Sequence, residues 1–115
     1  MRKVYIAGPM TGKYDFNYPA FDRLSKEWED RGWAVINPAN SFNRNQGLTH
    51  EEYIRAAIHL ILQADALALM VGWEDSKGAK LEAAIAQTLG LPVYQAENCR
   101  PIVMDDSRLD IRAIA

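Results

Sequence analysis

Short apolar runs alternate along the chain with longer stretches of mixed character. Four runs have the length of strands, namely Val4–Ala7, Trp33–Ile36, Ala66–Val71 and Leu91–Tyr94. The first three end at a glycine or at an asparagine–proline pair, which are signals for a turn. The third run is apolar throughout, as expected of a parallel strand that is buried on both faces.

Three amphipathic stretches lie between these runs and predict helices. The first spans 19–31, has a proline in its first turn and stops at Gly32. The second begins at Thr49, whose spacing to Glu52 is that of a capping box, and continues to about residue 63. The third spans 78–89 and stops at Gly90. The side chains expected to face the core are Phe21, Leu24 and Trp28 in the first helix, and Tyr53, Ile54, Ala57, Ile58 and Ile61 in the second.

Two segments fall outside this alternation. The polar stretch 39–47 predicts a loop, because it lacks any apolar period. After residue 100, Pro101–Met104 has the composition of an edge strand, and 107–115 fits either a final helix or an arm that docks on a partner.

Strands that alternate with helices imply a parallel sheet with right-handed crossovers. We therefore expect a single α/β domain over 1–115, a flavodoxin/Rossmann-like three-layer sandwich with strand order 2-1-3-4 and a possible fifth edge strand. In such sheets ligands bind beyond the carboxyl ends of the strands, at the point where the strand order reverses. That point lies between strands one and three.

Composition narrows the class of protein. The 115 residues carry a net charge of −2 with no basic block, which argues against nucleic-acid binding. With one cysteine, Cys99, and no HExxH motif, we expect no disulfide, metal or cofactor. The longest apolar stretch is interrupted by Asp65, and the N-terminus lacks a signal core, so we expect a cytoplasmic protein that does not enter membranes.

Glu82 stands in the third helix where an aliphatic side chain is the usual choice. The apolar stripe through Ile85, Ala86 and Leu89 reaches Glu82 one turn earlier, and then Gly78. A carboxylate on that face is partly desolvated, which raises its pKa and makes it a candidate nucleophile or base. The alternative is a glutamate at the edge of the stripe that extends to solvent.

Two glycine-bearing loops should meet at the crevice, and Glu82 rises from the helix behind one of them. The first is Gly8–Gly12, followed by Lys13, and the second is Gly72–Gly78. Backbone N–H groups in such loops suit a phosphate or a sugar hydroxyl, although a plain turn is the common alternative.

Other polar and aromatic residues near these loops have two interpretations each. Ser76 is placed to cap the third helix, or to hold a phosphate at the helix N-terminus. Trp73 and Tyr5 either stack on a base or pack in the core, and Asp75 either protonates a leaving base or caps the helix. Asp65 is expected to bond locally.

Taken together, these stretches resemble the nucleoside 2-deoxyribosyltransferase superfamily, in particular its small phage and bacterial branch. The resemblance rests on Val4–Gly12, on Asn37–Pro38, on Gln63–Asp65 with the strand after it, and on Gly72–Glu82. It extends over 4–94, and its most specific element is the glycine four residues ahead of the glutamate.

The resemblance implies roles for individual residues. Glu82 would attack the anomeric carbon of a deoxyribose, with Tyr5 set against it, and Asp75 would assist the leaving base. Gly8, Pro9, Met10 and Gly12, together with Trp73, Ser76 and Gly78, would contact the substrate, with Ser76 on a 5′-phosphate. It also implies a homo-oligomer in which a neighbour's C-terminal segment, with Asp105, Asp106 or Ser107, closes the site.

One position departs from the family's pattern. Active members carry an aspartate on the second helix, eight residues before the aspartate that opens strand three, and this chain has Ala57 there. Three hypotheses follow. The chain is an N-glycosyl hydrolase or deoxyribosyltransferase that acts on nucleosides or nucleotides, or a nucleotide-binding module with impaired catalysis. As a third hypothesis, it is a structural or partner-binding domain in which Glu82 pairs with Arg23, Lys77 or Lys80.

Overall fold

A computed structural model describes residues 1–10, 12–41 and 49–103. Four strands form one sheet in the order β2-β1-β3-β4, and every neighbouring pair is parallel. The strands are β1 (Lys3–Ala7), β2 (Ala34–Ile36), β3 (Ala66–Leu69) and β4 (Val93–Gln95). The α/β class and the strand order predicted from the sequence are confirmed.

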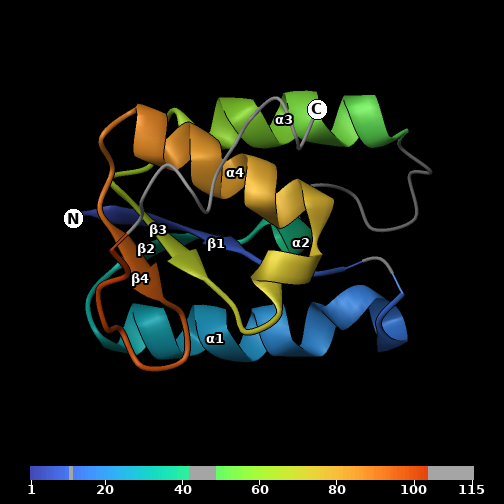
Figure 1. Ribbon diagram of the computed structural model, residues 1–115. Helices are drawn as coiled ribbons and strands as arrows, with labels where there is room; N and C mark the ends of the chain where they lie inside the picture. The colour runs from blue at the N-terminus through green and yellow to red at the C-terminus, as the bar shows by residue number, and fades with distance from the viewer. Residues whose placement is uncertain (11, 42–48, 104–115) are drawn as a thin grey trace.

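Helices cover both faces of this sheet (Figure 1). Helix α1 (Tyr18–Asp30) lies on one face, and α3 (His50–Ile61) and α4 (Lys77–Thr88) lie side by side on the other. A short helix α2 (Pro38–Ser41) follows β2, and two 3-10 turns, η1 (Tyr14–Asn17) and η2 (Trp73–Asp75), precede α1 and α4. The result is a three-layer sandwich.

Each layer boundary has its own core. Side chains of β1 and β3 alternate between the two faces, so each strand contributes to both cores. The cluster under α3 and α4 contains Tyr5, Ala7, Ala57, Ile61, Leu67, Leu69, Ala79, Ala83 and Ala86. The cluster over α1 contains Val4, Ile6, Phe21, Leu24, Trp28, Ala66, Ala68 and Met70. The predicted core positions of α1 are therefore confirmed, as are Ala57 and Ile61 of α3, while Tyr53, Ile54 and Ile58 are half-buried.

Several element boundaries differ from the prediction. Strand β3 ends at Leu69, and Val71, predicted inside the strand, is 77% exposed because the chain turns away at Gly72. The expected loop after β2 begins with helix α2, and residues 42–48 lie outside the described part of the chain. Of the possible fifth edge strand, the described residues contain one antiparallel bridge between Tyr94 and Pro101. Residue 104 and the possible arm at 107–115 lie outside the described part of the chain.

The buried stripe of α4 is also displaced from the predicted one. Its buried side chains are Ala79, Glu82, Ala83, Ala84 and Ala86, whereas Ile85 is half-buried and Leu89 is 47% exposed. Small alanines let α4 lie close to the sheet, and Leu89 falls beyond its last turn as the C-cap. Glu82 thus lies within the buried stripe and not at its edge.

The start of α3 agrees with the prediction. The Thr49 side chain accepts a hydrogen bond from the Glu52 backbone N–H, and the Glu52 carboxylate accepts one from the Thr49 backbone N–H. In the described part of the chain, no helix has both the length and the apolar character needed to cross a membrane.

Candidate functional site

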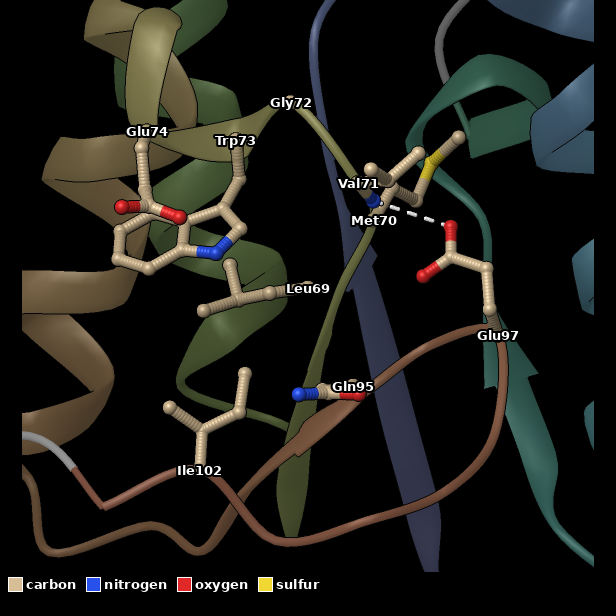
Figure 2. Close-up of a pocket in the computed structure, with 9 residues that line it drawn as sticks. All are labelled: Leu69, Met70, Val71, Gly72, Trp73, Glu74, Gln95, Glu97 and Ile102. Atoms are coloured by element: carbon tan, nitrogen blue, oxygen red, sulfur yellow. Dashed lines mark hydrogen bonds between the residues drawn. The ribbon is translucent and has the colours of Figure 1, made fainter.

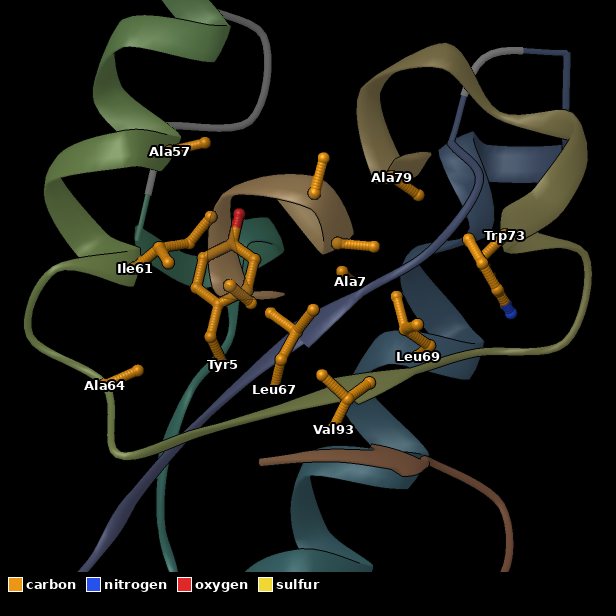
Figure 3. Packing of buried hydrophobic residues seen from close by; sticks show 13 residues of the cluster. Tyr5, Ala7, Ala57, Ile61, Ala64, Leu67, Leu69, Trp73, Ala79 and Val93 are labelled. Carbon is orange, nitrogen blue, oxygen red and sulfur yellow. The ribbon is translucent and has the colours of Figure 1, made fainter. Parts of the chain in front are cut away.

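Glu82 lies on the face of α4 that meets the sheet, and 3% of it is exposed. Tyr5, fully buried on β1, donates a hydrogen bond from its hydroxyl to Glu82 Oε2. Tyr5 is held in place by its strand, which pairs it with Ile36 on one side and Leu67 on the other. Figure 3 shows the Tyr5 ring rising from β1 with its hydroxyl directed toward the helices above the sheet.

Burial dominates the electrostatics of this pair. Loss of hydration raises the pKa of Glu82 to about 8, although the hydrogen bond from Tyr5 acts in the opposite direction. Burial also raises the pKa of Tyr5 well above its usual range, and the charge of Glu82 adds to this effect. The carboxyl group is therefore poised to change its protonation near neutral pH.

The pairing of Glu82 with Arg23, Lys77 or Lys80, which belongs to the third hypothesis, is not found among the described residues. Over the ranges that the structure describes, no cationic side chain pairs with Glu82, whose hydrogen bond comes from Tyr5. Arg23 and Lys77 are exposed, because both point away from the buried faces of their helices. A buried carboxylate without a cation is costly, which is why its protonated form is favoured.

Tyr53 belongs to the same cluster, although its position in the sequence predicted only a core residue. It projects from α3, packs against the cluster that contains Tyr5, and donates a hydrogen bond to Met10 Sδ at 3.5 Å. A hydrogen bond also links it with the Tyr5 hydroxyl, and burial followed by the charge of Glu82 raises its pKa. The signal that was present in the sequence is a tyrosine one turn before Ala57 on an otherwise apolar helix face.

The first glycine loop brings β1 and β3 close together. A Cβ atom on Gly8 would lie 2.7 Å from both the Cβ and the Sδ of Met70, so only glycine fits there. The loop is tied down by hydrogen bonds from Asn17 Nδ2 to the Pro9 carbonyl at 2.9 Å and from the Lys13 N–H to the Met10 carbonyl at 3.1 Å. Packing accounts for Gly8, and a ligand-binding role of this loop stays a prediction.

The second loop connects β3 to α4. Gly72 has a φ of +89°, which lets the chain turn sharply after β3. Ser76 is the N-cap of α4, since its Oγ accepts a hydrogen bond from the Ala79 N–H at 3.2 Å. Asp75 is exposed and does not cap the helix. Gly78 is half-buried, and a Cβ atom added to it would lie 4.0 Å from Ile54 Cδ1.

Asp65 lies at the other end of the sheet. Its carboxylate accepts a hydrogen bond from the Lys3 N–H at 2.8 Å, at the amino ends of β1 and β3. The bond was expected to be local in the sequence, but Lys3 lies on the neighbouring strand β1, so Asp65 instead ties the amino ends of two strands together.

Trp73 lines a pocket whose lining does not include Glu82. It is 6% exposed and borders a cavity of about 380 Å³ at the carboxyl ends of β3 and β4 (Figure 2). The lining consists of Leu69, Met70, Val71, Gly72, Trp73, Glu74, Gln95, Glu97 and Ile102, and it includes neither Glu82 nor Tyr5. Trp73 also packs in the cluster that contains Tyr5 and Ala79, so its packing in the core is observed and its stacking on a base stays a prediction.

Metal-binding groups are not assembled in the described residues, where no cluster of three or more His, Cys, Asp or Glu side chains could hold an ion. The groups that the structure does bring together around Glu82 are a carboxyl group, two phenols and a thioether. Glu82, Tyr5 and Met10 of the predicted set come together, and Tyr53 joins them.

Comparison with protein families gives a match over most of the chain. The model of a family described as "Domain of unknown function (DUF4406)" matches residues 2–95. This range contains all four strands and the helices that carry Tyr53 and Glu82. None of the curated proteins matches the chain.

Proposed function

The chain belongs to the DUF4406 family, and we propose that it cleaves the N-glycosyl bond of a nucleoside or nucleotide with Glu82 as the nucleophile. The observation that carries this proposal is the carboxyl group of Glu82, buried on α4 and bonded to the Tyr5 hydroxyl. The motifs that resemble the nucleoside 2-deoxyribosyltransferase superfamily supply the class of substrate.

A buried carboxylate suits this reaction because its charge is poorly solvated before attack and is neutralised in the glycosyl ester that forms. One oxygen of Glu82 attacks the anomeric carbon of the sugar, and the bond from that carbon to the base nitrogen breaks. The electron pair of that bond leaves with the base. Water, or a second base, then displaces the carboxylate from the anomeric carbon.

Tyr5 has a positioning role in this scheme. Its hydrogen bond to Oε2 fixes the carboxyl group and leaves the other oxygen for attack. The same bond lowers the pKa of Glu82 against the effect of burial, which raises the fraction of the ionised nucleophile.

Ser76 supports a phosphate-bearing substrate. Its Oγ accepts the capping hydrogen bond from Ala79, so its hydroxyl proton is left to donate to a phosphate oxygen at the positive end of α4. We accordingly favour a deoxynucleoside 5′-monophosphate over the free nucleoside.

A second function, nucleotide binding without turnover, is favoured by two observations. Glu82 is 3% exposed and has a pKa of about 8, so most of it is protonated at neutral pH and little of it meets a ligand directly. Ala57, fully buried, offers no second carboxylate. In this case the nucleotide would bind at the same place and leave intact.

The test is to incubate the protein with deoxynucleosides and their 5′-monophosphates and to measure free base by chromatography. The wild type should release base, Glu82→Gln should lose at least about 1,000-fold in rate as removal of a nucleophile does, and Glu29→Gln on the exposed face of α1 is the matched control. Equal rates for wild type and Glu82→Gln would overturn the proposal. Ligand-induced thermal stabilisation without base release would establish the second function instead.

A further inference from the structure

We propose that Tyr53 is the group that holds the leaving base, by donating a hydrogen bond from its hydroxyl to a ring or exocyclic acceptor of that base. The inference rests on the proposed function, because it assigns the second partner of the same reaction. It concerns a residue on α3, the helix that lies beside the one that carries Glu82.

Tyr53 lies next to the pair formed by Tyr5 and Glu82. Its hydroxyl is hydrogen-bonded with that of Tyr5, which in turn donates to Glu82 Oε2, so the three side chains form one connected polar group on β1, α3 and α4. Met10, at the start of the loop after β1, lies 3.5 Å from the Tyr53 oxygen. A sugar that meets Glu82 therefore has Tyr53 as the next hydroxyl donor along the site.

The hydroxyl proton of Tyr53 can be redirected to a ligand. Tyr5 commits its own proton to Glu82, whereas the proton of Tyr53 has two acceptors in reach, the Tyr5 oxygen and Met10 Sδ. A phenolic O–H rotates to suit its acceptor, and a thioether sulfur is a weak one. A nitrogen or carbonyl oxygen of a base is a stronger acceptor. When a ligand binds, the Tyr53 hydroxyl would therefore turn away from Met10 Sδ and donate to the base.

A hydrogen bond from Tyr53 would assist departure of the base. When Glu82 displaces the base, the electron pair of the broken bond moves onto the base, and a donor that faces this developing charge lowers the barrier. Burial and the charge of Glu82 keep Tyr53 protonated, so it donates a hydrogen bond and retains its proton. Water supplies the proton that the base gains, and the hydroxide that remains is consumed when water resolves the glycosyl ester.

Other polar groups are worse placed for this task. Asp75 is exposed at the end of η2, and the capping bond of Ser76 keeps it at the N-terminus of α4. Tyr53 is thus the donor within the described site that remains after Tyr5 is assigned to Glu82.

The experiment compares Tyr53→Phe with the wild type on two substrates that differ in their leaving group. On a deoxynucleotide with a natural base, removal of the donor should lower kcat by about 100-fold, the usual effect of losing one donor to developing charge. On a nitrophenyl deoxyriboside, whose leaving group stabilises its own charge, the loss should shrink to a few-fold. Tyr94→Phe is the control. Tyr94 lies on β4, where its ring packs against Trp28 and Trp33, and this variant should match the wild type on both substrates.

The outcomes separate this inference from the proposed function. Equal losses on both substrates would show a merely structural role and overturn the inference while the function stands. Absence of base release by the wild type would overturn the function, and binding then decides: deoxynucleotide should bind Glu82→Gln more tightly than Glu82→Gln/Tyr53→Phe in calorimetry. Equal affinities would overturn the role of Tyr53 as a donor to the base.

Discussion

The unusual residue is Glu82, an acid that is buried among alanines and has no compensating cation among the described residues. The described neighbours of Glu82 along α4 are apolar, and Tyr5 supplies its hydrogen bond. Such a group destabilises the fold when it is charged, so its retention needs either protonation or a function. Protonation has a measurable consequence.

Glu82 should make the protein less stable as the pH rises. Its folded pKa is about 8 and its ordinary value is 4.5, so between these values the folded state binds more protons than the unfolded state, and stability falls with increasing pH. Between about pH 5 and about pH 8 the free energy of unfolding should fall by about 3 kcal/mol. Glu82→Gln should remove the loss, and urea denaturation at both pH values measures it.

Glu29→Gln is the matched control, because that side chain is exposed on α1. It should keep the pH dependence of the wild type. A wild type that gains stability between about pH 5 and about pH 8, together with an unchanged slope in Glu82→Gln, would contradict the raised pKa.

The residues of the site were predictable to different degrees. Helical spacing alone singled out Glu82, and the resemblance paired it with Tyr5, a contact that the structure confirms. The packing of Trp73 agrees with one of its two predicted roles, and its contact with a base stays a prediction because sequence spacing does not tell what its exposed edge meets. Tyr53 was missed because a tyrosine on an apolar helix face has the same pattern whether its hydroxyl meets a polar partner or not.

At the scale of the element, the carboxyl ends of β1 and β3 meet so closely that they fix the identity of Gly8. Gly8→Ala should destabilise the protein by about 1–3 kcal/mol, the usual cost of overpacking, because the new Cβ would lie 2.7 Å from Met70 Cβ and Sδ. Thermal or urea unfolding measures the change. Met70→Ala in the Gly8→Ala background should recover only part of the loss, since the Cβ contact remains.

Gly12→Ala is an instructive comparison, because an added Cβ there meets no atom within 4 Å but the backbone has a φ of +80°. Its cost should come from backbone strain and be unaffected by changes at Met70. A full rescue of Gly8→Ala by Met70→Ala, or none at all, would contradict the contact as described.

The elements themselves were largely predictable, and their ends were not. The capping box placed the start of α3 at the right residue, because the two hydrogen bonds that define it are local. Val71 was assigned to β3 for its apolar character, although the turn at Gly72 leaves it exposed. Hydrophobicity does not reveal where a strand loses its partner, and the pairing of β3 with β1 stops at Leu69.

Across the whole domain, the alternation of strands and helices predicted a parallel sheet with right-handed crossovers, and the strand order expected for it is the one observed. The order β2-β1-β3-β4 places β1 and β3 at the centre, with cores on both faces. Glu82 and Tyr5 sit in the core beneath α3 and α4, and the pocket of Trp73 lies toward the β4 edge of the same face.

The two cores should contribute to stability independently, because the sheet separates them. Leu24→Ala, in the cluster over α1, should cost about 2–5 kcal/mol and Ile61→Val, in the cluster under α3, about 0.5–1.5 kcal/mol. In the double variant the costs should add to within about 0.5 kcal/mol, as for sites without shared neighbours. Urea unfolding of the four proteins in this cycle measures the coupling.

Ile61→Val with Leu67→Ala provides the contrast, since both side chains belong to the cluster under α3 and α4 (Figure 3). Their cycle should show a coupling above about 0.5 kcal/mol, because each change alters the space available to the other. A coupling of that size between Leu24 and Ile61 would mean that the central strands transmit packing from one face to the other. A change beneath α1 would then reach Glu82, and the site could no longer be treated as a property of one face of the sheet.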